Sequence, residues 1–324
     1  MARRGGWRRL GSRRFRYVDA RGRKIEDEES LERVRSLAIP PAWTDVWISP
    51  NAGAKLQAVG TDAAGRRQYL YHPSFRAAQE RAKFDRLLEF AAALPDLRLH
   101  TRRHLRLGPY EREWACAIAV QLVNHAWFRV GTERHTRSSR TYGVTTLTKR
   151  HVSIAGDEIA FRFHTKNRKL VSRTIANAVL ARELRALTEL ENGARLFRFE
   201  REGELVNVTA PLLNEYIGEH LGNGFTAKDF RTWGGTLLAA VELAKHGPAA
   251  DDAEAKRVLS AVMGKVAREL GNTPAVARSS YVSPAVVEQY EAGRTLEDFR
   301  TRSSRPPRLT ADERALVRLL RSER

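Results

Sequence analysis

The apolar pattern of the chain changes its period near residue 75, and this change divides the sequence into two kinds of structure. Upstream, apolar and polar residues alternate between turn signals, which is typical of half-buried strands. Downstream, apolar residues return every three or four positions, as in an amphipathic helix. The sequence therefore predicts an α+β chain. A small, mainly antiparallel-β domain over residues 1–78 precedes a larger, mainly α domain over residues 79–324 that carries a β-hairpin sheet.

The first domain contains a hairpin with a basic and aromatic outer strand. Lys55–Val59 alternates in polarity, Asp62-Ala63-Ala64-Gly65 is typical of a turn, and Arg66–Tyr71 forms the returning strand. Upstream of this hairpin, Ser30 is expected to cap a short helix that ends before Pro40-Pro41.

Helices are expected to dominate the second domain. The first runs from Phe75 to Ala93 and is expected to end at Leu94-Pro95, because proline cannot donate the backbone hydrogen bond of a helix interior. A second helix covers residues 111–128. Further helices are expected to begin near residue 173, at Pro211, after Thr226, over residues 252–270, at Pro274, at Pro284 and after Thr310.

A small β-rich insert is expected among these helices. Val144–Leu147 is strand-like, and His151–Phe163 predicts a hairpin around a Gly-Asp turn. His164–Arg168 is typical of a second tight turn, which leads into another strand. Near the carboxyl end, the Arg/Ser/Pro stretch over residues 300–308 is typical of a linker.

The chain is strongly basic, with 57 Lys and Arg against 38 Asp and Glu and a formal charge of +19. An apolar content of 42% is enough to bury a core, so wholesale disorder is disfavoured. Residues 1–24 hold ten basic groups and one acid, which suits either a DNA-holding arm or a solvated tail. The central block 98–185 mixes arginines with aromatic residues and suits a folded surface that holds phosphates. This charge predicts a polyanionic partner, by default nucleic acid.

Several kinds of site are disfavoured by what the chain lacks. Cys116 is the only cysteine, so neither an intramolecular disulfide framework nor a Cys-based zinc cluster can form. The sequence has no phosphate-binding Gly-x4-Gly-Lys-Ser/Thr loop and no His-Glu-x2-His motif. His100 and His104 have helical metal spacing, but the arginines around them would repel a cation. We therefore expect no cofactor and no bound metal.

The sequence gives no sign of secretion or membrane insertion. The first residues are basic but lack the apolar core of a secretory signal. The most apolar stretch, Trp114–Val123, is too short to span a bilayer. These features predict a cytoplasmic protein with no membrane partner, and its basic charge suits association with the nucleoid.

Metal-free chemistry at a phosphodiester has few possible components. A nucleophile must attack phosphorus, and an acid must protonate the leaving oxygen. Fixed cations must stabilise the charge that grows on the non-bridging oxygens, and the arginine fork suits this role best. The composition supplies serine, tyrosine, lysine, histidine and arginine in abundance, so it does not choose among them.

A set of short segments makes that choice. Taken in chain order, the segments resemble the type IB DNA topoisomerases, specifically their poxvirus-like and bacterial branch. No single segment is specific to the family. Together, however, the segments occur in the family's order and extend over nearly the whole chain. The segments are Gly65–Tyr71, Trp127–Gly131, Tyr142–Leu147, His151-Val152, Phe163–Asn167, Lys228–Gly234, Leu270–Pro274 and Ala277–Tyr281.

The resemblance implies a role for each catalytic position. Tyr281 would attack the scissile phosphate, form a 3′-phosphotyrosyl link and release a 5′-hydroxyl. Arg129 and Arg231 would hold the non-bridging oxygens. Lys166 would protonate the departing 5′-oxygen, and Lys228 would assist that proton transfer. The enzyme would then relax supercoiled DNA without ATP, by transient cleavage of one strand, swivelling and religation.

The resemblance also implies the contacts with DNA. Asn272 stands where the family commonly has histidine, so it can donate a hydrogen bond to a phosphate oxygen but cannot carry a charge. The partner would be double-stranded DNA, held by a monomer that clamps around the duplex. The candidate DNA-binding residues are Arg66, Arg67, Gln68, Tyr69, Tyr71 and His135.

Two other functions remain open at this stage. A tyrosine recombinase shares the catalytic core, but its second-arginine motif typically has histidine where this chain has Lys228, and its first domain is usually helical. A DNA-binding protein without catalysis would use the same groups only to grip phosphates, although the complete Arg-Lys-Arg-Tyr set argues against it. Taken alone, Tyr281 could also be an ordinary half-buried aromatic residue, and Arg231 a packed structural arginine.

Overall fold

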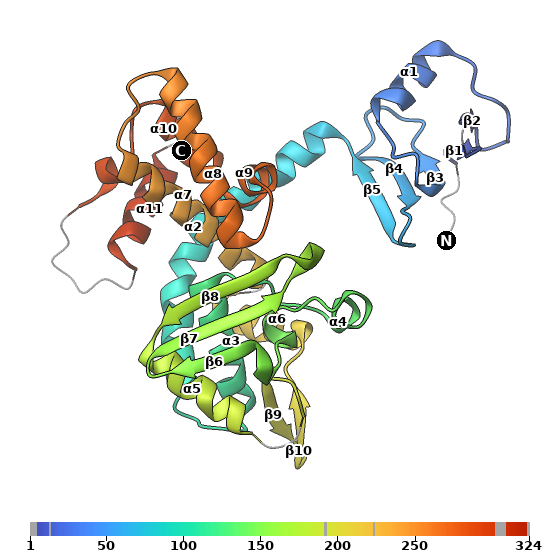
Figure 1. The fold of residues 1–324 in the computed structure, drawn as a ribbon. Helices are drawn as coiled ribbons and strands as arrows, with labels where there is room; N and C mark the ends of the chain where they lie inside the picture. Colours follow the sequence, from blue (N-terminus) through green and yellow to red (C-terminus); the bar gives the residue numbers. More distant parts are fainter. Residues whose placement is uncertain (1–4, 13, 191–192, 223, 302–308, 323–324) are drawn as a thin grey trace. The chain divides into compact units, whose positions relative to one another are not determined.

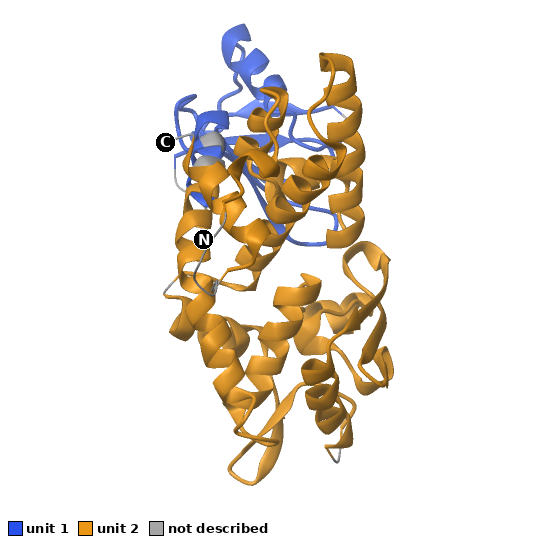
Figure 2. Cartoon of the chain, turned by 90° about the vertical axis from the view of Figure 1, so that its left-hand side faces the viewer, with its two compact units in different colours: residues 1–83 blue, residues 84–324 orange. Residues whose placement is uncertain are grey.

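The structure is a computed structural model that describes residues 5–12, 14–190, 193–222, 224–301 and 309–322. The chain divides into two compact units, Met1–Lys83 and Phe84–Arg324 (Figure 2). Helix α2 (Pro73–His104) begins in the first unit and ends in the second. The first unit is built on an antiparallel sheet and the second is mainly helical with small sheets, which confirms the predicted α+β class. Within the described ranges, no helix has the length and apolar character needed to cross a bilayer.

The first unit contains a five-stranded antiparallel sheet with the strand order β2-β1-β3-β4-β5 (Figure 1). The predicted hairpin is confirmed as β4 and β5, in which Val59 pairs with Tyr69. Its turn is closed by Asp62, whose carboxylate accepts the backbone N–H groups of Ala64 and Arg66. The strands are β1 (Trp7–Leu10), β2 (Arg16–Val18), β3 (Thr44–Ile48), β4 (Leu56–Thr61) and β5 (Arg67–Tyr71).

The outer strand β5 separates an apolar face from an exposed aromatic face. Val34 of helix α1 (Glu28–Ser36) packs in a small core with residues of β3 and β4, and Leu70 packs against that core. Tyr69 and Tyr71 are exposed, as expected from the two-residue period of a strand.

The amino-terminal part of this unit differs from the expectation in one respect, the residue that caps helix α1. Asp27, not Ser30, caps helix α1, because its carboxylate accepts the Ser30 N–H at 2.8 Å. A charged acceptor at this position also complements the helix dipole. Strands β1 and β2 are part of the folded unit, since β1 pairs with both β2 and β3 in the sheet.

The second unit is a helical body in which α7, α8 and α9 pack against one another (Figure 1). Predicted helix signals are confirmed here: Thr226 and Asp229 form a capping box, and Gly271 ends its helix with a φ of 63°. The helices that follow α2 are α3 (Arg112–Ala126), α4 (Glu133–Ser139), α5 (Ala178–Glu189), α6 (Ala210–Leu221), α7 (Ala227–His246), α8 (Asp252–Leu270), α9 (Pro274–Tyr281), α10 (Pro284–Glu291) and α11 (Ala311–Arg321).

Two small antiparallel sheets complete the second unit. The β6-β7-β8 sheet contains the predicted hairpin, and Phe128 contacts Phe161 and Phe163 edge to face at 5.3 and 5.2 Å between ring centroids. The sheet is thereby fixed to the chain that follows α3. The strands are β6 (Val152–Ala155), β7 (Glu158–His164), β8 (Leu170–Ala176), β9 (Arg198–Arg201) and β10 (Glu204–Asn207).

Helix α2 does not end at Leu94-Pro95, so that expectation is wrong. It continues through Pro95 to His104. Leu94 and Leu97 are both fully buried in the main core, and this packing outweighs the backbone hydrogen bond that proline removes.

Two further expectations for the second unit are wrong. Val144–Thr146 forms a short 3-10 helix, η1, instead of a strand. The segment after residue 170 stays extended to Ala176, and α5 starts only after Asn177, whose side chain accepts the Leu180 N–H. The remaining 3-10 helices are η2 (Lys149–His151), η3 (Lys166–Arg168) and η4 (Leu296–Phe299). The predicted linker at 300–308 falls outside the described residues over 302–308.

Candidate active site

Two arginines from different parts of the second unit meet at one backbone carbonyl. Arg129 donates from Nη1 to the Leu270 oxygen at 3.3 Å, and Arg231 donates from Nη2 to the same oxygen at 2.7 Å. Arg231 also donates to the Trp127 oxygen. Leu270 is the last residue of α8, where carbonyl groups lack helical partners and the helix dipole is negative. The carboxyl end of α8 thus brings the two guanidinium groups together.

The segment that carries Arg129 is held by a close contact with the backbone of Gly143 and Val144. The Val144 N–H donates to the Arg129 oxygen at 2.8 Å. A Cβ atom at Gly143 would lie 2.3 Å from that same oxygen, so only glycine allows the approach. Gly131 has a φ of 92°, which likewise favours glycine. These contacts give a structural reason for the two glycines in the Trp127–Gly131 and Tyr142–Leu147 motifs.

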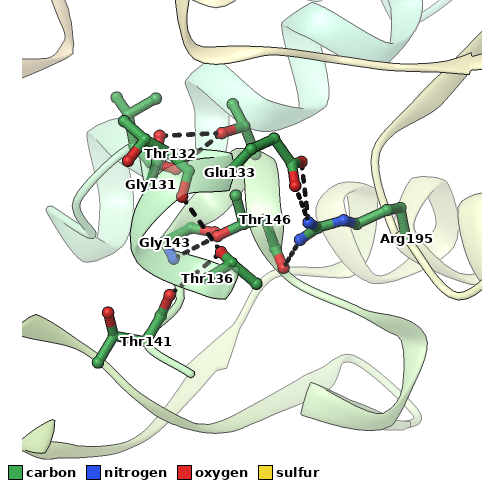
Figure 3. A network of polar contacts seen from close by, with 10 residues as sticks. Gly131, Thr132, Glu133, Thr136, Thr141, Gly143, Thr146 and Arg195 are labelled. Atoms are coloured by element: carbon green, nitrogen blue, oxygen red, sulfur yellow. Dashed lines mark hydrogen bonds and ion pairs between the residues drawn. The ribbon is translucent and has the colours of Figure 1, made fainter. Parts of the chain in front are cut away.

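A polar network around Thr146 supports this contact (Figure 3). The Gly143 N–H donates to the Thr146 hydroxyl at 2.9 Å, and Arg195 donates to the Thr146 carbonyl. Nη2 of Arg195 also donates to both carboxylate oxygens of Glu133, at 2.8 and 2.7 Å. Arg195, which precedes β9, therefore links helix α4 to the segment around Thr146.

Helix α7 carries Arg231, and two of its glycines allow Trp127 and Tyr281 to pack closely against it. A Cβ atom at Gly234 would lie 2.2 Å from Nε1 of Trp127, and one at Gly235 would lie 2.7 Å from the Tyr281 oxygen. The Thr236 hydroxyl donates to that Tyr281 oxygen at 3.1 Å. The Gly-Gly pair in α7 therefore allows two segments to approach the helix that carries Arg231.

Tyr281 lies at the end of α9, half-buried beside Arg231. The Arg231 guanidinium carbon is 5.0 Å from the Tyr281 ring centroid. Burial on its own would raise the pKa of the Tyr281 phenol, but the charges of Arg231, Arg129 and Lys228 outweigh burial and lower that pKa. A phenol with a lowered pKa is suited to act as a nucleophile.

The two arginines differ in burial. Arg231 is only 4% exposed, and this burial lowers its pKa to about 10. Burial also lowers the pKa of the half-buried Arg129. Both groups remain cationic at neutral pH, inside a protein environment that strengthens their attraction for an anion.

Asn272 lies beside Arg129, immediately after the end of α8. Its Oδ1 accepts a hydrogen bond from Nη2 of Arg129, and its backbone N–H donates to the Ala267 oxygen at 2.8 Å. The Nδ2 amide is buried and has no hydrogen-bond partner among the described residues. The side chain thus has an unused donor next to the arginine pair.

A cavity of about 560 Å³ opens between the β7–β8 turn and the end of α8, and Arg129, Arg231 and Asn272 line it. Lys166 and Lys228 do not line this cavity, and both are exposed. Lys228 belongs to the first turn of α7, three residues before Arg231. The structure therefore gathers the two arginines, Asn272 and Tyr281, and leaves Lys166 on an exposed turn.

Lys169 also lines the cavity, and sequence reasoning missed it. Its Nζ donates to the backbone oxygen of Asn272 at 2.7 Å. The two residues are 103 positions apart, so no local pattern in the sequence indicates the contact. The one available signal was the position of Lys169 at the end of the turn that carries Lys166.

The candidate DNA-binding residues of β5 fall on two faces. Asp62 accepts from Arg66 Nε and from Gln68 Nε2, each at 2.8 Å, and these bonds lower the pKa of Asp62. Tyr69 and Tyr71 stack on the opposite, exposed face with ring centroids 6.4 Å apart. Arg67 is on the Tyr69 side by the strand period, and Gln68 is not. His135, on exposed α4, has its ring 2.8 Å from the Thr132 hydroxyl.

A cluster of histidines joins α2 to α6. His100 and His104 of α2 contact His220 of α6, with ring centroids 4.8 and 5.2 Å away, and the His104 ring is bonded to the Tyr216 hydroxyl. In the described part of the chain, no group of three or more His, Cys, Asp or Glu side chains is arranged to hold a metal ion. Burial lowers the pKa of both His104 and His220.

Sequence comparisons match both units. A family model described as "Eukaryotic DNA topoisomerase I, catalytic core" matches residues 72–303, and one described as "Bacterial DNA topoisomerase IB, N-terminal domain" matches residues 14–62. The chain is 32% identical over 296 residues to a "DNA topoisomerase 1B" of Acanthamoeba polyphaga mimivirus, covering 89% of this chain and 88% of the relative. It is 22% identical over 270 residues to the "DNA topoisomerase 1B" of vaccinia virus (strain Copenhagen), covering 81% and 82%.

Proposed function

The chain belongs to the type IB DNA topoisomerases, and from this premise we propose that it relaxes supercoiled DNA through a covalent tyrosyl intermediate, without ATP. Tyr281 Oη attacks the scissile phosphorus as the P–O5′ bond breaks, which leaves a 3′-phosphotyrosine and a 5′-hydroxyl end. The cut strand swivels about the intact strand, and the 5′-hydroxyl then attacks the phosphotyrosine to restore the original bond. Because the phosphotyrosine retains a phosphodiester, religation needs no external energy source.

The observation that carries this proposal is the convergence of Arg129, Arg231 and Tyr281 at the end of α8. Arg231 stands over the Tyr281 ring and shares the Leu270 carbonyl with Arg129. A phosphate beside Tyr281 would thus meet two cations already fixed by backbone acceptors. Such preorganised charges stabilise a transition state without reorganisation during the reaction.

Asn272 supplies a neutral donor to the same phosphate. Its oxygen is held by Arg129, and this fixes the direction of the amide plane. The unpaired Nδ2 then has a phosphate oxygen as its natural acceptor. We assign Asn272 to stabilisation of the transition state, not to proton transfer.

We assign the role of general acid to Lys166, with assistance from Lys228. Lys166 is exposed outside the arginine-lined cavity, so its long side chain must reach the 5′-oxygen when DNA binds. Lys228 is placed at the start of α7 and contributes to the lowered pKa of Tyr281. A positioned acid of this kind contributes roughly 10²–10⁴-fold to rate.

The first unit holds the duplex in this proposal. Arg67, Tyr69 and Tyr71 present a basic and aromatic face on β5, and Arg66 and Gln68 flank it around Asp62. On the second unit, His135 would contact a phosphate from α4. With a formal charge of +19, binding is expected to weaken steeply as salt rises. We propose that one monomer surrounds the duplex and acts on the bacterial nucleoid.

The test uses supercoiled plasmid with EDTA and no ATP. Relaxed topoisomers, and a protein–DNA adduct after denaturant is added, are the expected results. Tyr281→Phe should lose both activities while it still binds DNA, and Tyr110→Phe, at an exposed position, should keep both. Persistent supercoils with the unmodified chain would refute the function, and relaxation by Tyr281→Phe would refute the choice of nucleophile.

A further inference from the structure

The turn that carries the proposed general acid needs an external support to hold its shape. Asn167 and Arg168, which follow Lys166, have φ angles of 61° and 55°. Asparagine tolerates this left-handed region, but arginine rarely adopts it, so the conformation of Arg168 persists only when surrounding contacts hold it. The Lys166 side chain has no hydrogen bond or ion pair with any described residue, so it does not supply that support.

Lys169 supplies two bonds that define this turn. Its backbone oxygen accepts the Thr165 N–H at 2.8 Å, which closes the turn upon itself. Its ammonium group donates to the backbone oxygen of Asn272 at 2.7 Å, which fixes the turn to the loop after α8. Arg168, the neighbouring cation, does not line the cavity and has no such bond to the loop.

The loop at the other end of this bond is itself rigidly held. Asn272 donates through its backbone N–H to Ala267 and accepts from Arg129 through Oδ1. A continuous path therefore leads from the turn through Lys169 and Asn272 to Arg129. It joins the proposed general acid to the groups that hold the phosphate.

We propose that Lys169 is a positioning residue, which docks the turn of Lys166 onto the Asn272 loop so that the acid approaches the 5′-oxygen in a fixed direction. The proposal rests on the proposed function. In the cleavage step Tyr281 Oη releases its proton to water and bonds to phosphorus, the P–O5′ bond breaks, and a proton passes from Lys166 Nζ to the 5′-oxygen. Lys169 transfers no proton in this step. Its removal should therefore impair leaving-group protonation and leave phosphate binding intact.

A change of leaving group distinguishes a role in positioning the acid from a direct action on the phosphate or on Asn272. Single-turnover cleavage is measured on a duplex with an ordinary scissile phosphodiester and on one with sulfur in place of the bridging 5′-oxygen. A thiolate leaves without protonation, so the sulfur substrate does not need the acid. The variants are Lys169→Met and Lys169→Arg, with Lys166→Met as the reference for a lost acid and Arg168→Met as the matched control.

Lys169→Met should slow cleavage of the ordinary substrate on the order of 10²-fold, the loss associated with a misplaced catalytic group. On the sulfur substrate it should approach the unmodified rate, as Lys166→Met should. Lys169→Arg keeps a donor and should restore most of the rate on the ordinary substrate, and Arg168→Met should match the unmodified chain on both. Lys169 is exposed, so these variants are expected to fold, and thermal melting checks this.

Two outcomes would overturn the assignment to Lys169 alone. Equal slowing on both substrates would mean that Lys169 acts on the phosphate or on Asn272 and not through the acid. An unchanged rate on both would mean that the bond to Asn272 has no role in catalysis. If the unmodified chain formed no covalent adduct with either substrate, the proposed function would fail and the assignment with it.

Discussion

The guanidinium carbon of Arg231 lies 5.0 Å from the centroid of the Tyr281 ring, so a buried cation stands over the proposed nucleophile. The same guanidinium is fixed by the Leu270 and Trp127 carbonyls. It therefore holds its place before DNA arrives, and it lowers the pKa of the phenol beside it. One side chain thus prepares the nucleophile and is placed to receive the phosphate charge.

Replacement of Arg231 by lysine should slow cleavage, although the charge is kept. A single ammonium group cannot donate to the two carbonyls and a phosphate oxygen with the geometry of a guanidinium fork. We expect a loss on the order of 10²–10³-fold in the single-turnover cleavage rate, as for other preorganised donors. Arg257→Lys, at an exposed position of α8, is the matched control and should cleave at the unmodified rate. Normal cleavage by Arg231→Lys would show that charge alone suffices.

Gly235→Ala tests the close approach between α7 and Tyr281. The added Cβ would meet the Tyr281 oxygen at 2.7 Å and its Cβ at 3.1 Å, so Tyr281 must shift. A shift of about 1 Å can cost on the order of 10²-fold in rate. Gly218→Ala in α6 has no atom within 4 Å of the new Cβ and serves as the control. Equal cleavage by the two variants would mean that Tyr281 is placed only when DNA binds.

Asn272→Ala should slow cleavage on the order of 10²–10³-fold, because it removes one donor to the transition state. Substrate affinity should change little, since Arg129 and Arg231 remain. The measurements are the single-turnover cleavage rate and the DNA-binding constant at one fixed salt concentration. Asn207→Ala, at an exposed position of β10, controls for loss of an amide. An unchanged cleavage rate would remove Asn272 from the mechanism.

Glu313→Ala should lower the free energy of unfolding. Glu313 is 3% exposed and accepts from both terminal nitrogens of Arg98 at 2.9 and 2.7 Å. Removal of one partner leaves the other charge partly buried and unpaired, at a cost of about 3 kcal/mol. The measurement is urea unfolding. Asp312→Asn, which loses an exposed pair with Arg300, should cost less than about 1 kcal/mol. If the two variants were equally stable, α11 would not depend on the Arg98 pair.

The free energy of unfolding should fall as the pH drops below 6.5, partly because His104 and His220 then become protonated. The pKa of each lies below the ordinary value of 6.5 in the folded chain, chiefly through burial. The unfolded chain therefore binds more protons in this range, and the stabilisation present above pH 6.5 is lost below it. The measurement is the melting temperature from pH 8 to pH 5.

Replacement of His104 and His220 together by glutamine should flatten this pH dependence without abolishing it. Burial also lowers the pKa of His125, and that of His151 to about 4, so these residues contribute with the same sign. A pH profile identical to that of the unmodified chain would show that the cluster of His100, His104 and His220 is stable when protonated.

The parts of the fold that follow local rules could be predicted from the sequence. The β4–β5 hairpin, the capping box at Thr226 and the Gly271 helix end each depend on neighbouring residues, and the structure contains them. The end of α2 could not be predicted, because distant core packing around Leu94 decides that the helix continues through Pro95. Local propensity is a weak guide where tertiary contacts compete with it.

The candidate site divides in the same way. The positions of Arg129, Arg231 and Tyr281 come from short motifs with a recognisable order, so they could be proposed from the sequence. The contact of Lys169 with Asn272 joins residues 103 positions apart and required the fold. The strand period places Gln68 opposite Tyr69 and Tyr71, but the structure was needed to show which of the two faces of β5 is exposed.

The carbonyl shared by Arg129 and Arg231 has a consequence for how natural selection can act on this chain. It holds two guanidinium groups side by side, where burial and the neighbouring charge of Arg129 both lower the pKa of Arg231. This burial and repulsion oppose folding whenever DNA is absent, and the carbonyl groups that accept from the two arginines offset part of that cost. Mutations that relieve this repulsion would make a sturdier but inactive chain. The site thus marks where stability is sacrificed for activity.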